Sequence, residues 1–370
     1  YYELRHGELP AGVRLAAREL HCDAETDVFL ESCDTSFCSS FAAYFLRFFF
    51  SVTDTNAILR RGQMFVLSSA QLRDVLAPVL APASVDVEAG HAGGVGRNIP
   101  ATVGTDGAHI PGLRLLDVGA GDGGVTARLA KYFDHVTVTE VSAPMVRRLR
   151  ERGYAAHHTA VISSDIFPTA GLFDVVSIFN VLDRCDNPRD LLADAIRLLK
   201  PGTGRLLMAV VLPFSEFVED GTERRAPHGM LPMRGARCGD GASFEHSLSA
   251  LLMRVFLPMG LCVERIAKVP YLCRGDMRRP YYVLADAILV FRYSPAEAEA
   301  QRTASLAHAV NEQGGRVPAA PVMPPTLGAL GSAPTLASAA ASSRAKAAAA
   351  SAALARPLDT ASLLRELPDD

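Results

Sequence analysis

Residues 115–126, LLDVGAGDGGVT, form the stretch that decides the fold class of this chain. The largely apolar residues 113–118, which include the start of this stretch, predict a buried strand. Four glycines then fall within residues 119–124. Because glycine has no Cβ, the chain can turn sharply there and its backbone can approach a ligand closely. A helical pattern follows over residues 125–133, and a helix start favours a negatively charged ligand group. The order strand, glycine turn, helix predicts a binding site for a nucleotide-like cofactor.

Glu140 decides which cofactor this site would hold. It closes a second predicted strand, residues 135–140 (HVTVTE), 23 residues after Asp117. An acidic side chain at that strand end can accept hydrogen bonds from both ribose hydroxyls. Nicotinamide enzymes use related glycine turns, but the spelling GAGDG after a strand aspartate favours an S-adenosylmethionine-dependent methyltransferase. The residues predicted to bind S-adenosylmethionine are Asp117, Gly119, Gly121, Asp122, Gly123 and Glu140.

Asp165 is a further candidate for the same cofactor. It lies in SSDIF, after the predicted third strand, where an acidic side chain could bind the adenine amino group. A loop aspartate exposed to water is the alternative interpretation.

Four zones of composition predict the domain organisation. Residues 1–82 are predicted to form an N-terminal helical extension, and residues 83–112 a Gly-rich flexible loop. Residues 113–293 alternate short apolar runs with amphipathic helical patterns, as in βαβ units on a parallel sheet. Residues 294–370 are Ala/Ser/Pro-rich and predict a low-complexity disordered tail. The predicted fold is therefore α/β, a Rossmann-like class I methyltransferase sheet with a helical extension and a disordered C-terminal tail.

Composition excludes several kinds of partner and site. The net charge is -3 and no long Lys/Arg run is present, so we expect no nucleic-acid partner. The 7 cysteines are scattered without a CxxC pair and away from histidine clusters, which predicts reduced thiols and no metal site. Residues 41–52 (FAAYFLRFFFSV) are too short to span a bilayer and contain Arg47. A buried helix is predicted there, with an interfacial membrane helix as the alternative. Nothing in the sequence assigns a compartment: the cytoplasm is the default, with endomembrane or mitochondrial association as alternatives.

The substrate side is predicted at the end of the fourth strand, residues 173–179. The chain continues there as FNVLDRCDNP, residues 179–188. In an open α/β sheet, ligands bind beyond the carboxyl ends of the strands. This placement brings Asn180 and Asp183 beside the transferable methyl group. An amide and a carboxylate together suit a substrate that donates a hydrogen bond next to a lone pair. For Asp183, the first turn of a helix is the alternative role.

Several motifs together resemble the DREV family. They are LLDVGAGDGGVT, the TE of VTVTE, FNVLDRCDNP, GRLLMAVVLPFSEFVE at residues 204–219, and VPYLCRGDM with PYYVLADAILV between residues 269 and 290. The resemblance runs from about residue 60 to residue 291, and the combination of LDRCD with PYLCRGDM is its most specific part. DREV proteins are the protein-L-histidine N-pros-methyltransferases, which methylate histidine in His-x-His motifs with a small middle residue.

The resemblance implies roles for particular residues. Asn180, Asp183 and Tyr282 would hold the target imidazole, and Tyr271 and Arg184 would contact the substrate in the same groove. Protein or peptide substrates with His-x-His motifs would be the partners. The chain departs from the family pattern in its Gly-rich insert, its longer third-strand region, its long tail and the arginines Arg274, Arg278 and Arg279. These arginines bear on peptide preference rather than on the chemistry.

The chemistry expected of Asp183 agrees with that activity. Neutral imidazole has one lone-pair nitrogen, which must face the methyl group. A carboxylate that accepts the Nε2–H selects the tautomer in which Nδ1, the pros nitrogen, is nucleophilic. Two alternatives stay open: a small-molecule methyltransferase acting on a quinone or a carboxylic acid, and a non-catalytic interaction protein with a methyltransferase fold.

Overall fold

The structure is a computed structural model that describes residues 2–33, 55, 58–59, 63–80, 112–220, 223–275 and 279–312. The chain divides into two units, residues 1–316 and 317–370, and every described residue belongs to the first. The predicted loop 83–112, apart from Gly112, and the apolar segment 41–52 lie outside the described residues. Among the helices of the described part, none is long and apolar enough to cross a membrane.

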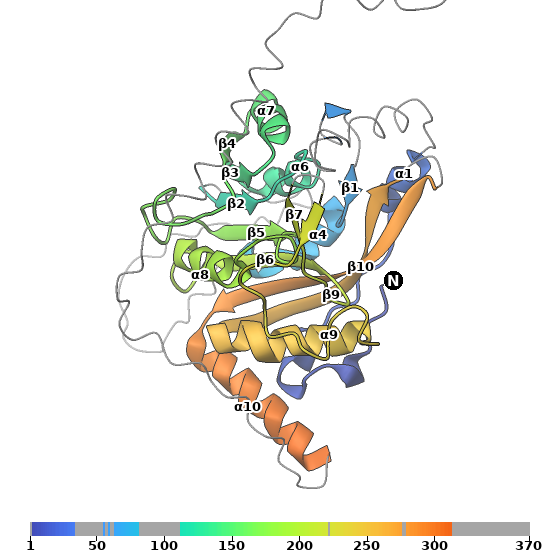
Figure 1. Cartoon of the computed structure of the whole chain (residues 1–370). Coiled ribbons are helices and arrows are strands. Elements are labelled where there is room, and N and C mark those ends of the chain that lie inside the picture. The colour runs from blue at the N-terminus through green and yellow to red at the C-terminus, as the bar shows by residue number, and fades with distance from the viewer. Residues whose placement is uncertain are drawn as a thin grey trace, which may run out of the picture. The chain divides into compact units, whose positions relative to one another are not determined.

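An eight-stranded sheet forms the centre of the described unit, in the order β1-β9-β10-β6-β5-β2-β3-β4 (Figure 1). Five strands run parallel: β2 (Arg114–Val118), β3 (His135–Glu140), β4 (Ala155–His158), β5 (Val175–Phe179) and β6 (Arg205–Val211). The long strands β9 (Leu261–Arg274) and β10 (Tyr281–Tyr293) are antiparallel to their neighbours. The chain leaves β2 on one side for β3 and β4, then returns on the other for β5 and β6. This reversal creates a crevice at the carboxyl ends of β2 and β5 and confirms the predicted Rossmann-like α/β fold.

Helices cover both faces of the sheet, because alternate residues of each buried strand point to opposite sides. In β2, Leu116 belongs to the core beneath α8 (Pro188–Leu198) and α9 (Phe244–Leu251). Its neighbour Leu115 belongs to the core beneath α4 (Ser69–Val75) and α6 (Thr126–Leu129). The chain continues from α6 into η3 (Ala130–Tyr132), and from α9 into η4 (Leu252–Phe256) and η5 (Leu257–Met259). These layers hold the carboxyl ends of the strands in fixed positions.

The N-terminal extension is not wholly helical. It contains η1 (His6–Glu8), η2 (Ala11–Ala16), α1 (Ala24–Glu31), α4 and α5 (Ala77–Leu80). It also supplies β1 (Met64–Phe65), which pairs antiparallel with β9 through Met64 opposite Cys273. A mainly helical extension was predicted here, and the strand β1 was not foreseen, because a strand this short has no readable periodicity.

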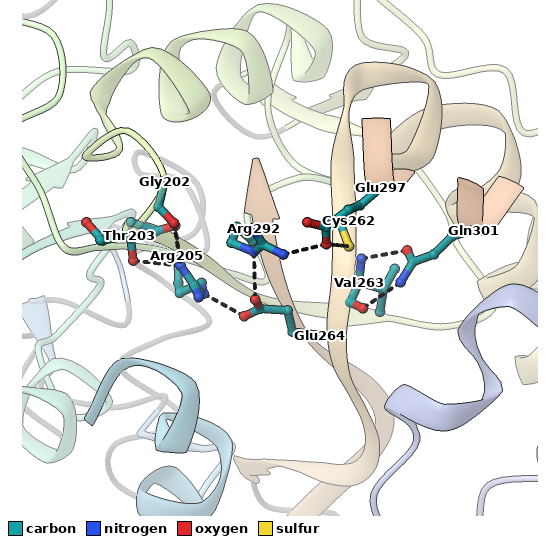
Figure 2. Close-up of polar contacts among 10 residues, drawn as sticks. Gly202, Thr203, Arg205, Cys262, Val263, Glu264, Arg292, Glu297 and Gln301 are labelled. Atoms are coloured by element: carbon teal, nitrogen blue, oxygen red, sulfur yellow. Dashed lines mark hydrogen bonds and ion pairs between the residues drawn. The ribbon is translucent and has the colours of Figure 1, made fainter. Parts of the chain in front are cut away.

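The C-terminal boundary also differs from the prediction. Helix α10 (Pro295–Glu312) begins where a disordered tail was predicted. The side chain of Gln301 makes two hydrogen bonds of 2.9 Å with the backbone of Val263 in β9, and Arg292 of β10 pairs with Glu297 (Figure 2). Ala298 of α10 is fully buried. The tail prediction was wrong for residues 295–312 because small side chains let the helix pack closely, which a count of large apolar residues does not reveal.

Candidate active site

The glycine turn after β2 is held against the ends of two other strands. The N–H groups of Gly119 and Ala120 both donate to the carbonyl of Thr139 in β3, at 2.9 and 3.0 Å. Gly119 has a φ of +71°, and a Cβ there would lie 2.4 Å from Cγ2 of Val181 in the loop after β5. No larger residue fits this position. The predicted cofactor turn and the predicted substrate loop are therefore in direct contact.

Asp117, which precedes this turn, links it to neighbouring elements through its buried side chain. Its carboxylate is buried and accepts hydrogen bonds from the hydroxyls of Thr126 and Ser177, both at 2.6 Å. Burial raises the pKa of Asp117 to about 6, although both hydrogen bonds act in the opposite direction. The side chain ties the start of α6 to β5, so the geometry gives it a supporting task at the turn.

Glu140 lies at the open side of the same turn. Its Oε2 accepts from the N–H of Gly121 at 2.9 Å, and its Oε1 accepts from Val141 and Ser142 at 2.8 and 2.9 Å. An ionised carboxylate offers about four lone-pair positions, so it can accept a further donor such as a ribose hydroxyl. Ser142 also caps α7 (Ala143–Glu151), as predicted.

The remaining cofactor candidates have different surroundings. Asp122 is buried and accepts from the N–H of Gly124 at 2.9 Å. A Cβ on Gly123 would lie 2.9 Å from Leu149 of α7, so Gly123 backs the turn. Asp165 is exposed in a turn between β4 and β5 and does not line the cavity described next. Its contact with adenine stays a prediction.

A cavity of about 40 Å³ lies between the glycine turn and the end of β9. The turn residues Gly119, Ala120, Gly121 and Asp122 line it, together with Asn180, Tyr271 and Met64. A Cβ on Gly121 would meet only Cε of Met64, at 3.8 Å. The residues fit S-adenosylmethionine in chemistry, because an open glycine backbone faces a strand-end carboxylate. Cofactor sites enclose roughly 300–1,000 Å³, so this cavity has to widen to admit it, and the flexible Met64 side chain beside Gly121 is one group that can move.

Asn180 and Asp183 both lie in the loop after β5. Asn180 has a φ of +56°, and it is the one non-glycine residue with positive φ in the described part of the chain. Its backbone N–H donates to the carbonyl of Ala209 in β6 at 2.8 Å, and its Nδ2 donates to Oδ2 of Asp286 at 2.9 Å. Asp183 is buried, with Oδ2 lying 3.1 Å from Nε of Arg184.

Three buried side-chain oxygens of this site have no hydrogen-bond partner among the described residues: Oδ1 of Asn180, Oδ1 of Asp183 and Oδ1 of Asp286. Buried acceptors are normally satisfied, so this set points to a ligand that donates hydrogen bonds. Burial raises the pKa of Asp183 to about 6, opposed by the charge of Arg184. Burial raises the pKa of Asp286 to about 8, and the charge of Asp183 adds to the effect.

Asp286 was missed by the sequence analysis. The signal was present, since Asp286 interrupts the otherwise apolar run ADAILVF at residues 285–291. An acidic residue inside a strand that is buried on both faces needs a reason.

The two tyrosines predicted to contact the substrate, Tyr271 and Tyr282, share one face of the β9–β10 ribbon with Asp286. Tyr282 pairs with Cys273, Leu284 with Tyr271, and Asp286 with Val269. Directly opposed side chains lie on the same face, and alternate residues return to it. The buried Tyr271 contacts the sulfur of Met64 through its hydroxyl and lines the cavity. Tyr282 lies further out and is 37% exposed.

Arg184 lies at the rim of the site. Its side chain is 39% exposed, and its guanidinium carbon lies 3.6 Å from the centroid of the Phe217 ring. Phe217 precedes the hairpin of β7 (Val218–Asp220) and β8 (Glu223–Arg225), and its N–H donates to the carbonyl of Asp183 at 2.9 Å. Arg224 lies 4.1 Å from the same ring. The hairpin thus borders the buried polar cluster with cationic side chains.

Comparison with curated proteins finds methyltransferases. The chain is 34% identical over 153 residues to the ubiquinone/menaquinone biosynthesis C-methyltransferase UbiE of Ruegeria sp. (strain TM1040), covering 38% of this chain and 60% of the relative. It is 33% identical over 103 residues to an uncharacterised methyltransferase of Mycobacterium bovis, covering 27% of this chain and 51% of the relative. The chain therefore spans about half to three fifths of these relatives.

Among solved structures, the N-methyltransferase NodS of Bradyrhizobium japonicum WM9 in complex with S-adenosyl-L-homocysteine matches with a TM-score of 0.31 and 18% identity. The match covers 49% of this chain and 78% of NodS. The trans-methyltransferase CalH in complex with S-adenosyl-homocysteine matches with a TM-score of 0.32 and 18% identity. This match covers 50% of this chain and 52% of CalH. These TM-scores are too low to support any inference about substrate.

The family match is more extensive than these local similarities. The family model described as DREV methyltransferase matches residues 105–293, which include the glycine turn, the loop after β5 and the β9–β10 ribbon. S-adenosylmethionine is the methyl donor of this fold class, and the turn with Glu140 has the chemistry to hold it. The chain belongs to the DREV methyltransferase family.

Proposed function

We propose that this enzyme methylates the pros nitrogen, Nδ1, of histidine in His-x-His motifs of protein or peptide substrates. The observation that supports the proposal is the pair of buried acceptor oxygens, on Asn180 and Asp183, that have no donor among the described residues. Leaving such an acceptor unsatisfied costs about 1–3 kcal/mol. A substrate that brings an N–H into this site removes that cost, and neutral imidazole carries one N–H beside one lone pair.

Asp183 selects the nitrogen that reacts. When its carboxylate accepts the Nε2–H, the lone pair is left on Nδ1, which faces the cofactor side. Bound S-adenosylmethionine supplies an activated methyl group there. The C–N bond forms at Nδ1 as the methyl–sulfur bond breaks, and the imidazole becomes a cation beside the Asp183 carboxylate. The Nε2 proton then leaves to solvent, so no strong base is required.

The raised pKa of Asp183 sets the direction of the pH dependence. With a pKa of about 6, the carboxyl loses its charge as the pH falls through that value. The protonated group no longer favours the reactive tautomer, and the target imidazole is itself protonated in the same range. We expect activity to rise from about pH 5 to about pH 7 and then to level off.

The surroundings of the site suit an extended chain segment. Tyr282 and Leu284 are exposed on the face of the β9–β10 ribbon that leads outward from Asp286. Arg184 and Arg224 lie over the ring of Phe217, whose N–H is bound to the carbonyl of Asp183. The net charge of -3 gives no reason to expect a nucleic-acid partner. An interfacial membrane contact through residues 41–52 stays a prediction, because these residues are not described.

A small-molecule substrate is the second candidate. It is favoured by the similarity to a quinone C-methyltransferase. A quinone precursor offers a ring carbon and hydroxyl donors instead of an imidazole N–H. The two candidates therefore differ in the atom that carries the new methyl group.

Labelled S-adenosylmethionine separates these candidates directly. The purified enzyme is incubated with His-Ala-His and His-Ala-Ala peptides and with demethylated quinone precursors, and products are identified by mass spectrometry. Acid hydrolysis followed by chromatography separates the pros and tele isomers of methylhistidine. We expect pros-methylhistidine, with His-Ala-His preferred. A predominantly tele product, or methylation of the quinone precursor alone, would contradict the proposal.

Asp183→Asn tests the role of the carboxylate. The amide keeps the size of the side chain but removes the charge that selects the tautomer. Loss of one preorganised electrostatic partner costs roughly 2.7–4 kcal/mol, so turnover should fall by at least about a hundredfold. Asp190→Asn, on the exposed first turn of α8, is the matched control and should leave turnover unchanged. A near-normal rate for Asp183→Asn would remove Asp183 from the mechanism.

A further inference from the structure

We infer that Asp286 is a positioning residue, which fixes the side-chain amide of Asn180 so that its carbonyl oxygen faces the substrate. The inference rests on the proposed function for the identity of the substrate. It concerns a residue on a different strand from the LDRCD motif, 106 positions away from Asn180 in the sequence.

The contacts of Asn180 show how it is held. Its backbone lies in the left-handed region, which costs energy for any residue other than glycine and persists only where the surroundings impose it. One anchor is the hydrogen bond from its N–H to Ala209 of β6. The other is the hydrogen bond from its Nδ2 to Oδ2 of Asp286 on β10. Two strands thus fix the backbone and the side chain of Asn180 separately.

The backbone holds Asp286 in place equally firmly. In the middle of β10 it pairs with Val211 of β6 on one side and with Val269 of β9 on the other. Its side chain has no exposed surface. A carboxyl in this position cannot swing away, so its oxygen defines one orientation of the neighbouring amide.

The orientation of the amide decides what the substrate meets. A primary amide has a donor end and an acceptor end. Because Asp286 takes the NH2 group, the Oδ1 of Asn180 is the end left without a partner. If the amide turned by half a rotation, it would present N–H donors where the substrate also has a donor. Asp286 therefore makes Asn180 an acceptor, in line with the unpartnered oxygen of Asp183.

The protonation of Asp286 is consistent with this task. Its pKa is raised to about 8 by burial and by the charge of Asp183, so the group is mostly neutral near pH 7. When the proton lies on Oδ1, the neutral carboxyl still accepts the hydrogen bond from Asn180 Nδ2 through Oδ2 and turns no donor toward the amide. The negative charge of the cluster then stays on Asp183, beside Arg184.

The test compares Asp286→Asn, which keeps an acceptor oxygen, with Asp286→Leu, which has similar size and no acceptor. On the unmethylated His-Ala-His peptide, we expect kcat of Asp286→Leu to fall by at least about thirtyfold and a measurable share of tele product to appear. Asp286→Asn should stay within about fivefold of wild type and give pros product alone. Calorimetry should show unchanged S-adenosylmethionine affinity in both variants. The isomer ratio distinguishes positioning from a general structural role, because loss of packing alone does not change which nitrogen reacts.

A second measurement is independent of the substrate. The chain has five asparagines, Asn56, Asn98, Asn180, Asn187 and Asn311, so selective 15N labelling of asparagine side chains gives few signals. Asn180→Ala assigns the signal of interest. We expect slow solvent exchange of the Asn180 NH2 protons in wild type and in Asp286→Asn, and fast exchange in Asp286→Leu.

The outcomes separate the two proposals. If the wild-type enzyme methylates no histidine peptide, the proposed function fails, while the exchange measurement still decides the role of Asp286. The inference about Asp286 is overturned if exchange is the same in wild type and Asp286→Leu. It is equally overturned if Asp286→Asn loses as much turnover as Asp286→Leu, because the charge rather than the acceptor would then matter. Should Asp286→Leu not fold, Asp286→Ala, which also lacks an acceptor, takes its place with the same expected exchange rate and product isomers.

Discussion

Glu140→Gln is the sharpest test of the cofactor site, because the structure shows what the carboxylate holds. Glu140 accepts three backbone N–H groups, from Gly121, Val141 and Ser142, and it uses both oxygens to do so. Glutamine has one acceptor oxygen, so at least one of these donors would face an NH2 group. When the remaining oxygen stays with Val141 and Ser142, the Gly121 contact is the one lost. The glycine turn then loses its link to β3, and the predicted ribose acceptor loses its charge.

The size of the effect follows from this contact. A hydrogen bond to a charged group contributes about 1.5–3 kcal/mol, which corresponds to a roughly ten- to hundredfold weaker binding of S-adenosylmethionine. Isothermal titration calorimetry measures the affinity, and thermal unfolding verifies that the variant is folded. Glu151→Gln on α7, whose side chain is 58% exposed, is the matched control and should bind as wild type does. Equal affinity of Glu140→Gln and wild type would refute our placement of the cofactor.

Three further expectations concern the fold around the site. Gly119→Ala should lower Tm and weaken cofactor binding, because a Cβ there meets Val181 at 2.4 Å in a left-handed backbone; Gly7→Ala, with open space around it, is the control. Deleting residues 317–370 should leave Tm and cofactor affinity nearly unchanged. Deleting residues 295–370 should lower Tm, because the contacts of α10 with β9 are removed. Equal Tm values for the two truncations would contradict the assignment of α10 to the fold. Since Asp286 has a folded-state pKa of about 8, the folded protein keeps a proton there that the unfolded chain releases above about pH 4. This group therefore lowers the free energy of unfolding by about 1 kcal/mol per pH unit as the pH rises between those values, and the Tm gain of Asp286→Asn over wild type should grow from about pH 5 to about pH 8.

The parts of the site that could be predicted from the sequence are those formed by neighbouring residues. The turn after β2, the end of β3 at Glu140 and the cap of α7 at Ser142 are each specified within one strand–turn–helix segment. Asn180 and Asp183 were found because they directly follow a recognisable strand. In each case the residue type and its distance from the strand end carry the information.

The parts that could not be predicted depend on contacts between distant segments. Asp286 meets Asn180 only because β10 inserts beside β6. The two-residue strand β1 is stabilised by pairing with β9, and its own sequence shows no strand pattern. Helix α10 is held by Gln301 and by the buried Ala298. The composition of this helix resembles that of the low-complexity residues that follow it.

The position of Met64 has a kinetic consequence. Its side chain touches the hydroxyl of Tyr271 on the substrate side and stands over Gly121 on the cofactor side. Admission of the cofactor displaces this one side chain from both places at once. The Tyr271 hydroxyl would then lose its contact with Met64, and could turn to a substrate, only after the cofactor has entered. Turnover should consequently follow a compulsory order, with S-adenosylmethionine arriving first and its demethylated form departing last.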